Sequence, residues 1–151
     1  MQVTTSWAMS ITGADRIKFN EAVSKGHYPC APQTRAGARR EFDMADMVGL
    51  FAFARMTELG LLPRHAGSLA CQAADIVRQD SDAQSVFIAR ALSGETWILP
   101  YYGEGKDKGR VCFNPGGKGY SVAVEVNIAN VKQAVTDGVH RLSAIQAAAN
   151  G

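Results

Sequence analysis

The sequence predicts an α+β protein, because hydrophobic residues recur at helical spacing in the first half of the chain and give way to short β-branched and aromatic runs in the second. The chain has 151 residues, 46% of them hydrophobic, which is enough for a packed core in one or two small domains. The polar stretch QDSDAQ, residues 79–84, separates the two patterns. We therefore predict a helical domain over residues 1–79 and a β-rich domain, ending in a helix, over residues 85–151.

Two helices are expected at the start of the chain. A short apolar helix covers residues 7–11 and stops at Gly13, and a second covers residues 14–24 and stops at Gly26. Glycine commonly ends a helix because it adopts the left-handed conformation without strain. The two helices are therefore joined by a tight turn.

A basic hairpin is expected next, over residues 27–42. Pro29 and Pro32 favour an extended run, because proline disfavours the helical conformation of the residue before it. Gly37 marks a turn, after which the chain is expected to return as a second strand. The hairpin carries three arginines within six residues, namely Arg35, Arg39 and Arg40.

Two longer helices complete the first half. Asp43 is a good N-cap for a helix that ends at Gly60, and Pro63 suits the first turn of another helix that runs to residue 79. Arg64 and His65 lie at the start of this last helix, where a helix N-terminus attracts anions.

The second half is expected to form four antiparallel strands and a terminal helix over residues 128–149. The strands are predicted at residues 85–92, 96–102, 110–114 and 120–127. Apolar residues of the terminal helix follow a seven-residue pattern, which needs a partner surface, either the chain's own sheet or the same helix of a second subunit. We predict a homodimer, with the dimerisation residues Ile128, Val131, Val135, Leu142 and Ile145.

The net charge of +2 is too small for a polycation, so any nucleic-acid surface must come from local clustering. Such a cluster exists: residues 14–40 contain six basic and two acidic residues. Helix, tight turn, helix and two-stranded wing, in this order, are typical of the winged helix-turn-helix, which lays its second helix in the major groove of DNA.

The order and spacing of these pieces resemble the DNA-binding domain of the mercury-resistance-regulator (MerR) type, including its excisionase-like relatives. The resemblance covers roughly residues 6–75. The matching pieces are the turn Thr12-Gly13-Ala14, the closing Lys25-Gly26, the wing from Arg35 to Phe42, and the helix from Asp43 onward. The chain departs from the family in having Asn20, Glu21 and Ala22 where Arg-Tyr-Tyr is frequent. The resemblance implies a DNA-binding function with a winged helix-turn-helix fold.

Helix geometry then selects the DNA-binding residues. Phe19, Ala22 and Val23 share one face of the second helix and are expected to pack inward, which turns the other side chains toward DNA. Asn20 is the preferred base reader, since its amide can pair with adenine N6 and N7. Glu21 requires a cytosine amino group or an ion pair with Lys18 or Lys25. The predicted DNA-binding residues are Arg16, Ile17, Lys18, Asn20, Ser24, Lys25, Tyr28, Arg35, Arg39 and Arg40.

The predicted function is sequence-specific binding of double-stranded DNA as a dimeric transcriptional regulator. Three alternatives stay open: an excisionase-like architectural factor of a mobile element, a protein-interaction adaptor that uses the basic hairpin, and a sensor whose β-rich half binds a small-molecule effector. The sensor alternative rests on the aromatic residues Trp97, Tyr101, Tyr102 and Phe113.

No catalytic, metal or cofactor site is predicted. The sequence contains no nucleophile elbow and no H-E-x-x-H motif, so we expect no enzyme. Cys30, Cys71 and Cys112 stand far apart and are expected to be reduced thiols, and His27 with Cys30 lacks the second pair of ligands that zinc needs. With no membrane span and no signal peptide recognised, we expect a cytoplasmic protein.

Overall fold

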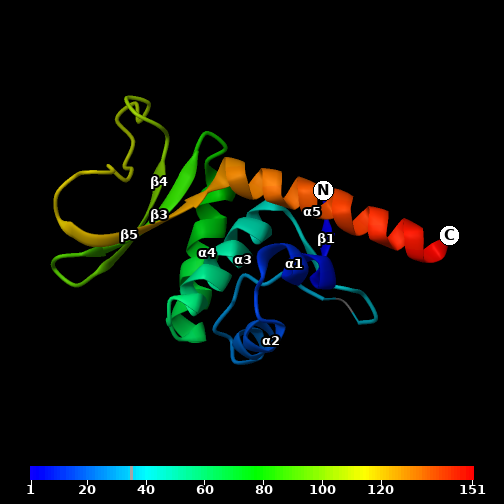
Figure 1. Ribbon diagram of the computed structural model, residues 1–151. Coiled ribbons are helices and arrows are strands. Elements are labelled where there is room, and N and C mark those ends of the chain that lie inside the picture. Colours follow the sequence, from blue (N-terminus) through cyan, green and yellow to red (C-terminus); the bar gives the residue numbers. More distant parts are fainter. Residues whose placement is uncertain (35) are drawn as a thin grey trace.

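The computed structural model describes residues 1–34 and 36–151 and has a mixed α+β fold, as predicted. Within these residues five helices combine with one two-stranded and one three-stranded antiparallel sheet. Figure 1 shows the larger sheet at one end, the helices α1 to α4 beside it, and α5 running across them. The elements are β1 (Val3–Thr4), α1 (Thr5–Thr12), α2 (Arg16–Ser24), β2 (Glu41–Phe42), α3 (Met44–Glu58), α4 (Pro63–Gln79), β3 (Ser85–Ala91), β4 (Thr96–Tyr101), β5 (Tyr120–Asn127) and α5 (Ile128–Asn150).

The two short helices and their turn form as predicted. Gly13 ends α1 in the left-handed conformation, with φ of 72°, and its N–H donates to the carbonyl of Met9 at 2.9 Å. Asp15 caps α2, because its carboxylate accepts from the backbone N–H of Lys18 at 2.9 Å. A three-residue connection thus separates α1 from α2.

The predicted hairpin over residues 27–42 is absent from the described part of this range, residues 27–34 and 36–42. β2 pairs instead with β1 at the start of the chain, with Val3 opposite Phe42 and Thr4 opposite Glu41. The segment before it turns back on α2, where the N–H groups of His27 and Tyr28 both donate to the carbonyl of Ala22. Prolines in this segment lack the N–H that a strand ladder uses, so the amino-terminal strand supplies the partner of β2.

The helices α3 and α4 form where predicted and pack against each other. Asp43 and Asp46 make a reciprocal capping box at the start of α3, and Pro63 occupies the first turn of α4. α4 also approaches the segment after α2 closely: a Cβ atom added at Gly67 would lie 2.2 Å from the carbonyl oxygen of His27. A side chain at this position would push the segment away from α4.

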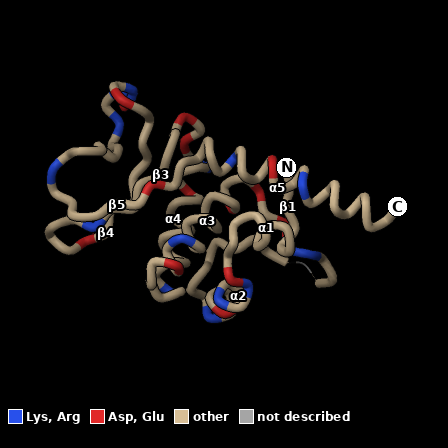
Figure 2. Tube along the Cα trace, viewed as in Figure 1, with Lys and Arg blue, Asp and Glu red and all other residues tan. Residues whose placement is uncertain are grey.

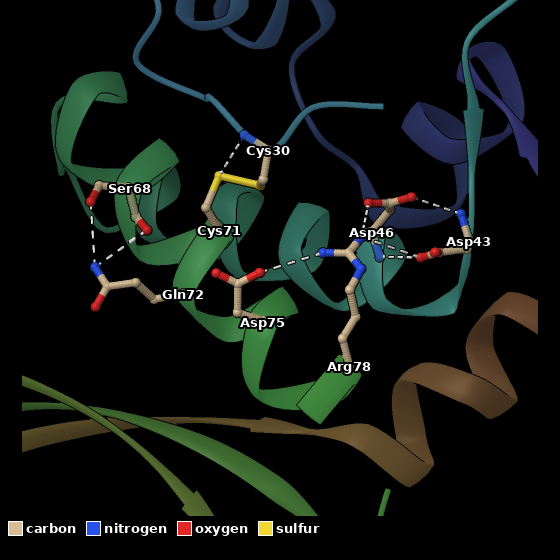
Figure 3. The surroundings of a disulfide bond; sticks show 8 residues. All are labelled: Cys30, Asp43, Asp46, Ser68, Cys71, Gln72, Asp75 and Arg78. Carbon is tan, nitrogen blue, oxygen red and sulfur yellow. Dashed lines mark hydrogen bonds and ion pairs between the residues drawn. A yellow bond between two sulfur atoms is a disulfide. The ribbon is translucent and has the colours of Figure 1, made fainter. Parts of the chain in front are cut away.

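A disulfide bond joins Cys30 to Cys71 on α4, with the two Cα atoms 5.5 Å apart (Figure 3). The expectation of three reduced thiols is therefore wrong for this pair, whereas Cys112 is a free, half-buried cysteine. The two bonded residues are 41 positions apart, and the sequence does not reveal that the fold brings them together. The bond fixes the segment after α2 to α4.

Three of the four predicted strands of the second half form, in the order β4-β3-β5. Val86 and Ile88 of the central strand are buried in the core shared with the helices. The fourth predicted strand, residues 110–114, is irregular, although the N–H of Phe113 donates to the carbonyl of Pro100. Phe113 stacks on Phe87 on the other face of the sheet, with ring centroids 4.3 Å apart. Glycines with positive φ surround this segment and favour a loop over a strand.

α5 packs its first half on the body of the molecule and extends beyond it at its carboxyl end (Figure 1). A Cβ atom added at Gly138 would lie 2.5 Å from the side chain of Ile11, so this glycine lets α5 contact α1 closely. Buried residues from both halves of the chain form one hydrophobic cluster. The change from helices to strands lies where predicted, but the two halves share a core. In the residues described, no helix has an apolar stretch long enough to cross a membrane.

Candidate nucleic-acid interface

The outward face of α2 is the surface that sequence analysis assigned to DNA. Ile17 is 78% exposed, and Asn20 is also exposed, whereas Phe19 is fully buried on the opposite face. The other predicted contacts on this helix and its end are also exposed: Arg16, Lys18, Ser24 and Lys25. The division of α2 into a buried and an exposed face is therefore confirmed. Figure 2 shows basic positions on α2 and on the segment that leads to β2.

Aromatic packing holds α2 in place. The ring of Phe19 lies 5.1 Å from the ring of Tyr28, 5.8 Å from that of Phe42 and 6.2 Å from that of Phe53, measured between centroids. These contacts come from the segment after α2, from β2 and from α3, so one side chain joins α2 to three parts of the fold. The direction of the exposed side chains is set by this anchor.

Tyr28 is not part of the surface, which corrects the prediction that it contacts DNA. It is 3% exposed, and its ring packs between Phe19 and Phe53. Burial, with a smaller effect of the Asp46 carboxylate, raises the pKa of the Tyr28 hydroxyl above its ordinary value. Tyr28 serves the core rather than the interface.

Glu21 pairs with Lys25 one turn later on α2, with 2.5 Å between Oε1 and Nζ. The hydrogen bond and the positive charge of Lys25 lower the pKa of the Glu21 carboxyl. Of the arrangements considered for Glu21, the ion pair with Lys25 is the one the structure contains. Both side chains are more than half exposed, so their contribution to stability is small.

A cavity of about 490 Å³ opens beside α2. It brings together the amino ends of α1 and α2 with the segment before β2. Its described lining contains three arginines and no acidic residue: Thr4, Thr5, Ser6, Arg16, Asn20, Thr34, Arg39 and Arg40. We call this the basic cavity. The arginines and Asn20 were predicted from the sequence. The hydroxyl residues were not predicted; Thr4, Thr5 and Ser6 reach the site because β1 pairs with β2.

Arg40 is half-buried in the basic cavity and forms no ion pair with any described residue. Its carbonyl accepts from the Thr5 hydroxyl at 3.2 Å, and its guanidinium carbon lies 5.7 Å from the centroid of the Phe19 ring. Its Nη1 atom is buried and lacks a hydrogen-bond partner within residues 1–34 and 36–151. Arg16 and Arg39 take part in none of the ion pairs of the described chain either. Arg35 lies outside the described residues.

The other flank of α2 faces the start of α4. A cavity of about 340 Å³ here is lined by Glu21, Ala22, Lys25, His27, Leu62, Pro63 and Arg64. Arg64 and His65 are exposed, as a contact with a flanking phosphate requires. Basic residues thus stand on both sides of the exposed face of α2.

The predicted dimerisation residues divide into two groups. Ile128, Val131 and Val135 are buried in the chain's own core, so their assignment to a subunit interface is wrong. Leu142 is half-buried and Ile145 is 59% exposed, and both lie in the second half of α5. The seven-residue pattern of the sequence is real, but its first half faces this chain.

The β-rich half contains a wider cavity of about 740 Å³, lined by the loop that follows β4. Arg110 lies over the ring of Tyr102, 3.6 Å from its centroid, and pairs with Asp80 and Asp82. Burial and the Asp80 carboxylate raise the pKa of Tyr102 to about 12. These contacts tie the loop to the end of α4. Among the described residues, no group of three or more His, Cys, Asp or Glu is placed to hold a metal ion.

Comparison with known proteins yields neither a matching family model nor a similar curated protein.

Proposed function

We propose that this chain is a sequence-specific double-stranded DNA-binding protein that acts as a dimeric transcriptional regulator. The observation that carries the proposal is the exposed face of α2, which presents Asn20 and Ile17 beside a cavity whose arginines form no ion pair within the described residues. A helix held by its apolar face and bordered by basic residues has the shape and charge that fit the major groove.

α2 would read bases through its exposed side chains. The helix has nine residues and is about 14 Å long, enough to present a few side chains to neighbouring base pairs. Asn20 would donate to adenine N7 and accept from adenine N6, and Ile17 would contact a thymine methyl group. Because Glu21 is neutralised by Lys25, it does not oppose the approach of phosphates as a free carboxylate would.

Backbone contacts would come from the residues that border α2. Arg16, Arg39 and Arg40 lie on one side, and Arg64 lies on the other. Arginines without a carboxylate partner are available to phosphates, and each such contact releases counterions from the duplex. Binding would therefore weaken steeply as the salt concentration rises.

A second copy belongs to the proposal, because one α2 reaches only a few base pairs. Two copies related by a two-fold axis would read both halves of a palindromic site. Leu142 and Ile145 remain as the candidate contacts, since neither is fully buried and both belong to the second half of α5, whose carboxyl end extends beyond the body of the molecule in Figure 1. Sedimentation of the wild type and of Ile145→Lys tests this: we expect a dimer that dissociates in the variant, and a monomeric wild type would contradict it.

The DNA-binding proposal is tested by selecting duplexes from a random pool with the purified chain. We expect one enriched motif, and we expect Asn20→Ala to relax the preference at a single base position by about 1–3 kcal/mol. Asn130→Ala, an exposed asparagine on α5, is the matched control and should leave the motif unchanged. Enrichment of no motif, even at low salt, would contradict the proposal.

A further inference from the structure

We propose that the basic cavity is a binding site for one phosphate group and that Arg40 is the residue that fixes it there. The inference rests on the proposed function for the source of the phosphate, a phosphodiester of the DNA backbone. The site itself is defined by the cavity and its donors, which exist whether the phosphate belongs to DNA or is free.

The charge of the lining favours an anion. Three arginines face one space of about 490 Å³, and none of the described lining residues is acidic. Arg110 provides a comparison, because it is the other half-buried arginine of the described chain and has two carboxylates within 4 Å. Arg40 has none. A group with negative charge and several acceptor oxygens would supply what Arg40 lacks.

Arg40 is also held more firmly than its neighbours in the cavity. Its carbonyl is bonded to Thr5, the next residue begins β2, and its guanidinium lies over Phe19. Its buried Nη1 has no acceptor within the described residues. Arg39 lines the same cavity but is exposed, and it makes none of these contacts with the described residues. A guanidinium whose position is fixed by the surrounding residues is preorganised for bidentate recognition of phosphate.

The start of α1 borders the same space. Thr4 occupies the N-cap position but makes no side-chain cap hydrogen bond. Thr4, Thr5 and Ser6 all line the cavity, so the amino-terminal end of α1 forms part of its wall. The positive end of this helix therefore acts together with the arginines rather than alone.

The position of Asn20 links the proposed phosphate site to base recognition. Asn20 lines the basic cavity and also belongs to the exposed face of α2. A phosphate held by Arg40 would therefore stand at a constant offset from the side chain that reads the base. Arg40 would set the register of α2 along the groove.

The first arm of the test uses inorganic phosphate and the full chain at constant ionic strength. We expect a saturable rise in melting temperature with phosphate for the wild type, and at least a tenfold weaker response for Arg40→Gln. Arg110→Gln is the matched control for a half-buried arginine and should respond as the wild type does. Arg40→Lys keeps the charge in case Arg40→Gln does not fold, and it should show an intermediate response because a single ammonium cannot bind bidentately.

The second arm uses duplexes of the selected motif in which one linkage is an uncharged methylphosphonate. We expect one linkage in each half-site to weaken wild-type binding at least tenfold, and the same linkage to have no further effect on Arg40→Gln. The inference would be overturned if the methylphosphonate weakened Arg40→Gln as much as the wild type at every linkage, and if the two proteins also responded equally to inorganic phosphate. That result would leave DNA binding intact. An Arg40-dependent phosphate response without any enriched duplex would support the site and contradict the proposed function.

Discussion

Arg40 and Arg110 are the two half-buried arginines of the described chain, and they differ in what surrounds them. Both lie over an aromatic ring, of Phe19 and Tyr102 respectively. Arg110 pairs with Asp80 and Asp82, whereas Arg40 stands with two further arginines in a cavity without a described acidic residue. The difference suggests two roles: Arg110 joins a loop to the body of the molecule, and Arg40 is available to a partner from outside.

The largest expected effect comes from removing the ring beneath Arg40. Phe19→Ala should lower the free energy of unfolding by about 3–5 kcal/mol, because a fully buried aromatic side chain is replaced by a cavity. The variant should also lose DNA binding, since α2 loses its anchor. Chemical denaturation and duplex binding measure the two effects, and DNA binding at wild-type affinity would show that α2 does not need this packing.

Reducing the Cys30–Cys71 bond should have the next largest effect. The bond closes a loop over a sequence separation of 41, for which chain entropy gives about 4 kcal/mol of stabilisation. It also holds the segment between α2 and Arg40, so DNA affinity should fall with it. Denaturation with and without a dithiol reductant tests this, and Cys112→Ser, which leaves the bond intact, should retain the same difference.

Replacing Arg110 and Arg40 one at a time should separate their effects on stability and on DNA affinity. Arg110→Gln should lower the free energy of unfolding by about 1–2 kcal/mol, because it removes two partly exposed ion pairs and a cation–π contact. It should leave duplex affinity within twofold of the wild type. Arg40→Gln should have the opposite profile, with little loss of stability and at least a tenfold loss of affinity. A loss of duplex affinity in both variants would contradict the assignment of a structural role to Arg110 and a DNA-binding role to Arg40.

The smallest expected effect is a pH dependence around Arg110. The pKa of Tyr102 rises from 10.0 to about 12 because of burial and the nearby Asp80. The folded state therefore retains the phenolic proton where the unfolded state loses it, and the stabilisation is complete below pH 10 and is lost between pH 10 and 12. Tyr102→Phe should flatten the stability profile over this range. An identical profile for both proteins would show that the hydroxyl does not contribute.

Much of the helical half can be predicted from local signals. Gly13 and Asp15 mark the turn and the start of α2, and the 3.6-residue period correctly separates Phe19 and Ala22 from Ile17 and Asn20. Such signals act within one or two turns of helix, so they need no knowledge of the rest of the chain.

Long-range contacts explain what the sequence did not reveal. β2 pairs with the two-residue strand β1, and such a short strand carries no recognisable period. Tyr28 was predicted to be exposed on a basic hairpin. In the structure its segment turns back on α2 instead, and Tyr28 is buried in the core. The apolar pattern of α5 identifies a contact face without identifying its partner, so Val131 and Val135 were assigned to a second subunit instead of to this one.

The most direct test is the salt dependence of binding to the selected duplex by the wild type and by Arg39→Ala/Arg40→Ala. Each lost phosphate contact reduces the slope of log affinity against log salt concentration by about 0.9, and the proposed dimer holds one phosphate in each of its two basic cavities, so we expect a slope shallower by about 1.8 in the double variant. An unchanged slope would contradict the proposal that the basic cavity beside α2 lies on the DNA backbone.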